Sequence, residues 1–204
     1  MIQIKIKHSG GNGVIIAAPS SNPAADRTLL LPSDGDSTID TLARAGNILQ
    51  VKQTVKKDVF SASLATGAVS SDVITVSITP TSSTNKILII PTLSVSGYTA
   101  FQYLYKDGSL ISDAIGDASS TSGVARASFA HSANILSNMT QTSMYLDTAG
   151  GTSAITYSIR LQHNQNSTQT VFVNRSADDE ASPVIASYIF ARYISTFTAM
   201  EVAV

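Results

Sequence analysis

The chain contains no cysteine and no tryptophan, and only 13% of its 204 residues are charged, about half the usual share. The absence of cysteine excludes disulfide bonds, thiolate zinc sites and cysteine nucleophiles. The chain has 13 basic and 14 acidic residues and no basic cluster. Binding to nucleic-acid phosphates depends on concentrated positive charge, so we expect no nucleic-acid partner.

Long hydrophobic runs are also missing. No apolar stretch approaches the roughly 18–20 residues that a membrane-spanning helix needs, so we expect no membrane insertion. The N-terminus, MIQIKIKH, alternates isoleucine with polar residues and lacks the continuous apolar core of a signal peptide. Hydrophobic residues nevertheless make up 43% of the chain, which is too many for a disordered protein.

Small hydroxyl residues are abundant, with 30 serines and 21 threonines. Together with 12 glycines and 6 prolines, this composition is typical of an all-β protein with many turns. We therefore expect an all-β fold made of a short N-terminal segment, residues 1–46, a connector strand, residues 47–58, and a β-sandwich, residues 59–204.

The N-terminal segment predicts a β-hairpin. Isoleucines alternate with polar residues over positions 2–7, glycines at 10–13 supply a turn, and residues 14–18 form the return strand. A third apolar run follows at residues 28–31. A segment this small cannot bury its own apolar side chains, so we expect copies from other subunits to cover them. The predicted assembly contacts in this segment are Ile2, Ile4, Ile6, Ile15, Leu29 and Leu31.

The C-terminal unit shows short β-type runs separated by turn signals. The expected strands are residues 59–65, 72–79, 85–96, 99–106, 109–115, 123–131, 140–147, 153–163, 169–174 and 185–203. The Asp107-Gly108 pair between two of them predicts a tight hairpin turn. Eight to ten strands at this spacing favour a β-sandwich of jelly-roll type.

Candidate chemistry is sparse. His8, His131 and His163 are far apart in the sequence and show no metal-ligand spacing. Residues 34–36 lack the spaced ligands of a calcium loop, and the acidic run 178–180 has no facing carboxylate with which to form a glycosidase pair. We therefore expect no catalytic residue, no metal ion and no cofactor, and we interpret the chain as a non-enzymatic protein.

The aromatic residues between positions 98 and 105 leave two interpretations open. They are Tyr98, Phe101, Tyr103 and Tyr105. Aromatic rings on adjacent strands commonly fill the core of a sandwich, which is the more frequent case. The alternative is a surface patch on which sugar rings stack.

Residues 22–39, NPAADRTLLLPSDGDSTI, resemble an element that recurs in fibre and other virion proteins of tailed bacteriophages, especially marine and cyanobacterial phages. The opening residues 4–14 and the junction at 46–51 are similar to segments of the same proteins. The sequence departs from the usual element at Leu30, commonly threonine, and at Ser33, commonly aspartate or glycine. Neither change affects the predicted strand and turn. Further similar stretches in the C-terminal unit are residues 78–88, 156–161, 173–176 and 194–201.

The resemblance implies a homotrimeric structural protein of the virion, assembled in the host cytoplasm. Its implied partners are further copies of itself, other virion proteins of the tail or capsid, and a host surface glycan or receptor. Arg175, within the Val173–Ser176 motif, is expected either to anchor a subunit interface or to lie in a simple turn at the end of a strand. The implied function is that of a short tail fibre or fibre tip. The alternative is a capsid decoration or head-fibre protein.

Overall fold

The computed structural model describes residues 3–7, 10–11, 13–17, 44–97, 100–117, 127–131, 139–163, 165–176 and 192–204. The chain divides into two compact units, Met1–Asp40 and Thr41–Val204. Each unit is considered by itself. Within the described residues, no helix is long and apolar enough to cross a membrane.

The smaller unit contains an antiparallel hairpin, which confirms the hairpin predicted from the alternating isoleucines. Strand β1 covers Gln3–Lys7 and β2 covers Gly13–Ala17. The register pairs Ile4 with Ile16 and Ile6 with Val14. Residues 2, 29 and 31 of the predicted assembly set lie outside the described residues, as do the side chains at positions 4, 6 and 15.

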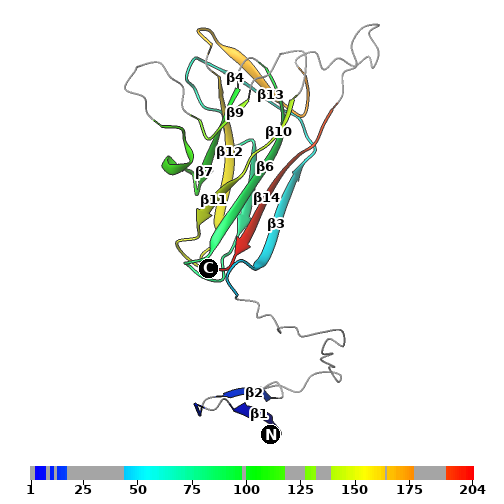
Figure 1. The fold of residues 1–204 in the computed structure, drawn as a ribbon. Coiled ribbons are helices and arrows are strands. Elements are labelled where there is room, and N and C mark those ends of the chain that lie inside the picture. The colour runs from blue at the N-terminus through cyan, green and yellow to red at the C-terminus, as the bar shows by residue number, and fades with distance from the viewer. Residues whose placement is uncertain are drawn as a thin grey trace. The chain divides into compact units, whose positions relative to one another are not determined.

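The larger unit is built from two antiparallel sheets, as the sequence predicts (Figure 1). In the first sheet the order is β3–β14–β6–β13–β4, and both β10 and β11 pair with β6. Its strands are β3 (Ile48–Lys56), β4 (Phe60–Leu64), β6 (Lys86–Ser96), β10 (Met139–Thr142), β11 (Tyr145–Thr148), β13 (Gln169–Val173) and β14 (Ser195–Val202).

The second sheet has the order β5–β12–β7–β8, with β9 also paired to β7. Its strands are β5 (Ile74–Ile78), β7 (Ala100–Lys106), β8 (Ser109–Leu110), β9 (Phe129–His131) and β12 (Ile155–His163). The chain passes repeatedly from one sheet to the other, so that most neighbours in a sheet are distant in sequence.

The core lies between the two sheets and follows the period of two in the sequence. On β12 the buried positions alternate as expected, with Ile155, Tyr157, Ile159 and Leu161 each at most 5% exposed. The first sheet contributes, among others, Ile87, Ile89, Leu93, Val171 and Phe197, which are fully buried. This clustering of branched and aromatic side chains supplies the main apolar burial that stabilises the unit.

Two turns need backbone conformations that the sequence provides. Asp107 and Gly108 both have positive φ, 49° and 79°, and join β7 to β8, which confirms the predicted tight turn. Gly97 has φ 126°, and a Cβ at this position would lie 2.9 Å from the Thr170 carbonyl oxygen. Gly97 is therefore required both by conformation and by the close approach of β13.

The expected connector contains a full strand of the sandwich. β3 pairs with β14 from Lys56 opposite Ser195 to Ile48 opposite Val202, so it forms one edge of the first sheet. The apolar face of β14 extends the core toward this edge. Alternation in residues 47–58 predicts the strand, but its partner is 140 or so residues away and no local signal identifies it.

Two expected strands differ in the structure. The run 140–147 is interrupted between β10 and β11 at Ser143 and Met144, which lie opposite Pro91 of β6. Proline has no N–H to donate, so regular pairing stops there. The run 109–115 ends after two residues and continues as the 3-10 turn Ser112–Ala114, because the Ser-Asp pair favours a turn.

Candidate functional site

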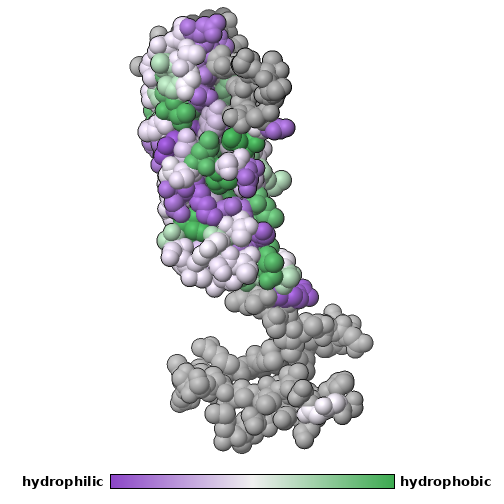
Figure 2. Space-filling view, turned by 90° about the vertical axis from the view of Figure 1, so that its left-hand side faces the viewer, coloured by the Kyte–Doolittle hydropathy of each residue, from purple (hydrophilic) through white to green (hydrophobic). Residues whose placement is uncertain are grey.

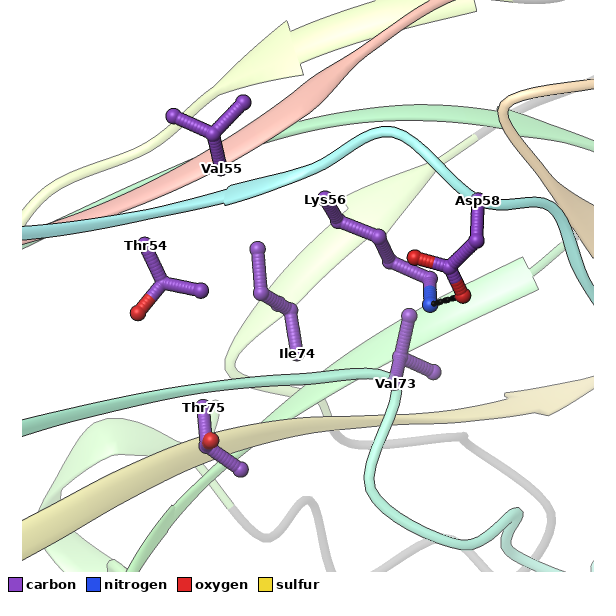
Figure 3. A pocket seen from close by; sticks show the side chains of 7 residues that line it. All are labelled: Thr54, Val55, Lys56, Asp58, Val73, Ile74 and Thr75. Carbon is purple, nitrogen blue, oxygen red and sulfur yellow. Dashed lines mark hydrogen bonds and ion pairs between the residues drawn. The ribbon is translucent and has the colours of Figure 1, made fainter.

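A shallow groove lies between the edge strands β3 and β5, one from each sheet (Figure 3). Its volume is about 220 Å³. Val73 and Ile74, only 4% and 5% exposed, contribute apolar side chains to the groove. Its other lining residues are Thr54, Val55, Lys56, Asp58 and Thr75.

An ion pair closes one end of this groove. The Lys56 ammonium donates to Asp58 Oδ2 at 2.5 Å, and this hydrogen bond lowers the pKa of the Asp58 carboxyl. The Lys56 side chain is largely buried, and its Nζ lies 6.0 Å from the centre of the Phe60 ring. In Figure 3 Thr54 and Lys56 point toward β5, whereas Val55 points to the opposite side of β3.

The polar groups of the groove are the threonine hydroxyls and the Lys56–Asp58 ion pair, whose chemistry suits hydrogen bonding to a small hydroxyl-bearing group. The volume of the groove is below the roughly 300–1,000 Å³ of sites that enclose a whole small molecule. Its lining offers no nucleophile next to a base, because its single carboxylate already pairs with Lys56.

The histidine side chain that the structure describes, His163, is a core residue. It is 1% exposed, its Nε2 lies 2.7 Å from the Leu64 carbonyl oxygen, and its Nδ1 accepts a hydrogen bond from the Gln165 N–H at 3.0 Å. These partners assign the proton to Nε2. His8 and the side chain of His131 lie outside the described residues.

No group of three or more histidine, aspartate or glutamate side chains within the described part of the chain is arranged to hold a metal ion. The acidic runs 34–36 and 178–180 lie outside that part.

The core interpretation is wrong for Phe101 and Tyr105, which are half-buried and lie outside the hydrophobic core cluster, whereas Tyr103 is itself buried at 8% exposed. Gln102 and Leu104, on the other side of the strand, face the core and are 1% and 0% exposed. Tyr98 lies outside the described residues. The outer face of the second sheet therefore carries an aromatic row.

This aromatic row is covered by polar side chains of the neighbouring β12. The Arg160 guanidinium carbon lies 4.1 Å from the Tyr105 ring centre, and Arg160 Nε donates to Asp72 at 2.6 Å. The Tyr103 hydroxyl donates to Gln162 Oε1 at 2.6 Å, and Tyr103 is only 8% exposed. The rings are thus occupied by internal contacts, which argues against their use as a platform for sugar stacking.

Arg175 is partly buried at the end of β13. Its Nε donates to the Ser176 carbonyl at 3.0 Å, and its guanidinium lies 5.0 Å from the Phe172 ring centre. These contacts are within the chain, and they agree with the simple turn at the end of a strand. A role of Arg175 between subunits stays a prediction.

The preceding residue, Asn174, has a larger structural role than the sequence suggests. It is fully buried with φ 63°. Its Nδ2 donates to the carbonyls of Lys56 and Asp58, and its Oδ1 accepts from the Ser195 hydroxyl. Asn174 therefore joins the bend between β3 and β4 to the start of β14.

Glu201 is a fully buried carboxylate that sequence reasoning missed. It accepts hydrogen bonds from Gln50 Nε2 at 2.6 Å, the Thr81 N–H at 2.6 Å, the Thr81 hydroxyl at 2.8 Å and Asn85 Nδ2 at 2.7 Å. Burial opposes its ionisation, but these hydrogen bonds outweigh burial and lower its pKa to about 2. The sequence feature that could have predicted its burial is the alternation along β14, in which Glu201 falls on the same, core-facing side as Phe197 and Ala199.

Another network of hydrogen bonds, partly buried, joins three strands. Lys106 Nζ and the Tyr157 hydroxyl both donate to Asp147 Oδ2 at 2.7 Å. Burial and the bond to Asp147 raise the pKa of the Tyr157 hydroxyl. Lys106 also donates to the carbonyls of Thr148 and Ala149, so the network ties β7 and β12 to the end of β11.

The chain matches no protein-family model and no curated protein.

Proposed function

We propose that this chain is a structural protein of a tailed-bacteriophage particle, with the role of a short tail fibre or fibre tip in host attachment. The resemblance of residues 22–39 to the recurring virion element carries this proposal. It is supported by the similar stretches in the C-terminal unit, which extend the resemblance over most of the chain.

The fold is compatible with this role. In the first sheet of the larger unit, three positions are each shared by two consecutive strands: β3 with β4, β14 with β13, and β11 with β10. Together with β6 they give four positions side by side. The second sheet also has four positions, occupied by β5, β12, β7, and β8 with β9. A chain that alternates between two sheets of four strand positions each supports a jelly-roll arrangement. This architecture is common in viral surface proteins. Low charge and abundant hydroxyl side chains suit a particle surface that stays soluble without strong fields.

The second candidate is a capsid decoration or head-fibre protein, and the small dimensions of the two units favour it. A sandwich of about 150 residues has a radius of gyration of about 15 Å. The hairpin strands of the smaller unit are five residues each, so each adds only about 17 Å. Units of these dimensions suit a protein that decorates the particle surface.

Antibody labelling of intact particles in electron microscopy tests the location. Label at the tail tip supports the fibre, and label distributed over the head supports decoration. Absence of the chain from purified particles would contradict both versions. The proposal includes no enzymatic step, no cofactor and no nucleic-acid contact.

The homotrimer proposed for the N-terminal unit gives a separate prediction. If the face bearing Ile4 and Ile6 packs between subunits, Ile4→Asp places one carboxylate per copy in an apolar contact and weakens association by at least about 10-fold. Lys5→Asp, on the opposite face of β1, is the matched control and should leave association unchanged. Analytical ultracentrifugation of both variants provides the measurement, and equal assembly would contradict an interface at β1.

A further inference from the structure

The two outer faces of the sandwich differ in character. On the outer face of the second sheet, polar side chains with internal partners cover the aromatic row of β7, for example Arg160 with Asp72. The outer face of the first sheet instead carries exposed hydrophobic side chains. Ile48, Val51 and Leu146 are 56%, 53% and 54% exposed.

These hydrophobic side chains form a continuous row across four strands. The register places Val51 of β3 beside Met200 of β14, Met200 beside Leu88 of β6, and Leu88 beside Leu146 of β11. All four residues alternate with core-facing neighbours, for example Ala199 and Ile89, so they share the outer face.

The rows on either side add apolar side chains among polar ones such as Gln53, Thr198 and Thr148. Ile48 and Val202 are paired on one side of the central row, and Ile90 lies beside Thr198 on the other. Met144, in the break between β10 and β11, is 68% exposed, and Val55 is 45% exposed. Hydrophobic side chains reach the surface of the unit among the hydrophilic ones in the side view of Figure 2.

Charge is nearly absent from this face. Of the side chains at the paired positions in these rows, one is charged, that of Lys86. Its Nζ donates a hydrogen bond to the Thr148 hydroxyl at 2.7 Å. The centre of a protein interface is typically depleted of charge, whereas the freely exposed face of an antiparallel sheet is typically polar.

We propose that this face, defined by Ile48, Val51, Leu88, Leu146, Met200 and Val202, packs against further copies of the same chain. Four strands about 4.8 Å apart and about eight residues long at 3.3 Å per residue span about 500 Å² in projection. The accessible area of such a face, with its side-chain relief, approaches the roughly 800 Å² per partner of a stable interface.

A second copy fits this face better than a charged partner. An apolar face without opposing charges is complementary to itself, and a chain with only 13% charged residues offers no field to attract an oppositely charged protein. The contact is formed by the sandwich and does not depend on the particle on which the protein resides. It is also independent of the contact proposed for β1.

The test uses the full chain in analytical ultracentrifugation at micromolar concentrations. The double variant Val51→Glu with Leu146→Glu should raise the dissociation constant about 100-fold, because it introduces two charges into a closed apolar contact. Both side chains are about half exposed in one chain, so circular dichroism should remain that of the folded wild type. Ser77→Glu, on the exposed edge strand of the other sheet, is the control and should assemble like the wild type.

The absence of cysteine allows a second measurement that does not depend on breaking the assembly. Val51→Cys should react with a maleimide several-fold more slowly than Ser77→Cys under assembling conditions, and at a similar rate after dilution to the monomer. A wild-type chain that is monomeric at these concentrations, or a double variant that assembles normally, overturns the proposal. Equal labelling of both cysteines in the assembled state also overturns it, even where Ile4→Asp disrupts association.

Discussion

Replacing Glu201 with alanine is expected to lower the free energy of unfolding by about 3 kcal/mol, because it removes the shared acceptor of four hydrogen bonds, of which the one from Asn85 is buried and the other three are partly buried. The buried Asn85 amide would lose a charged acceptor that solvent does not readily replace, whereas Thr81 and Gln50 lie closer to solvent. Chemical denaturation of the wild type and the variant measures the difference.

Glu201→Gln is the matched control, since it keeps the volume and one carbonyl acceptor. It should cost about half as much, because hydrogen bonds to a neutral acceptor are weaker than those to a carboxylate. Equal stability of the alanine variant and the wild type would show that the hydrogen bonds around Glu201 contribute nothing net to folding.

The same carboxylate predicts an acid dependence of stability. The pKa of Glu201 in the folded chain is about 2, below the ordinary 4.5, so the folded state binds fewer protons than the unfolded state. Its contribution is complete above the ordinary pKa and is lost as the pH falls toward 2. Between about pH 6 and about pH 3 this loss amounts to about 2 kcal/mol. The slope should be absent from Glu201→Gln, and an unchanged slope in that variant would assign acid sensitivity to other carboxyls.

Asn174→Ala is expected to destabilise the sandwich by about 3–4 kcal/mol. The substitution removes two donations to backbone carbonyls and one acceptance from Ser195, each worth about 1 kcal/mol when buried, and it places alanine at positive φ at a cost of about 1 kcal/mol more. Thermal or denaturant unfolding provides the measurement.

Asn174→Gly separates the two causes. Glycine adopts positive φ without strain, so this variant should recover about 1 kcal/mol relative to alanine while still lacking the three hydrogen bonds. If both variants unfold like the wild type, the bend between β3 and β4 is held without Asn174. If the glycine variant is as stable as the wild type, the positive φ alone accounts for the contribution of Asn174 to stability.

The residue patterns were sufficient for local features of this fold. Alternation of hydrophobic and polar residues predicts β1, β2 and most strands of the sandwich, because a half-buried strand exposes every second side chain. The Asp-Gly pair predicts the turn after β7, since few residues tolerate positive φ at two successive positions. Neither feature requires knowledge of distant partners.

The same patterns do not identify the groups that join distant segments. From the sequence, residues 47–58 are interpreted as a connector strand, because the strand with which they pair, β14, is at the other end of the chain. The sequence suggests core positions for the rings of Phe101 and Tyr105, because alternation does not say which of two apolar faces is inside. The break opposite Pro91 depends on which strand pairs with β6.

By itself, the sequence determined the all-β class, the hairpin and the alternating core strands, because backbone geometry sets these from neighbouring residues. Only the tertiary structure decided that Glu201 and Asn174 are buried polar centres and that the outer face of β3, β14, β6 and β11 is apolar. A hydrogen-bond cluster or a cross-strand row is a sum of contacts between residues up to about 150 positions apart. Such contacts exist only once the register of every strand has been fixed.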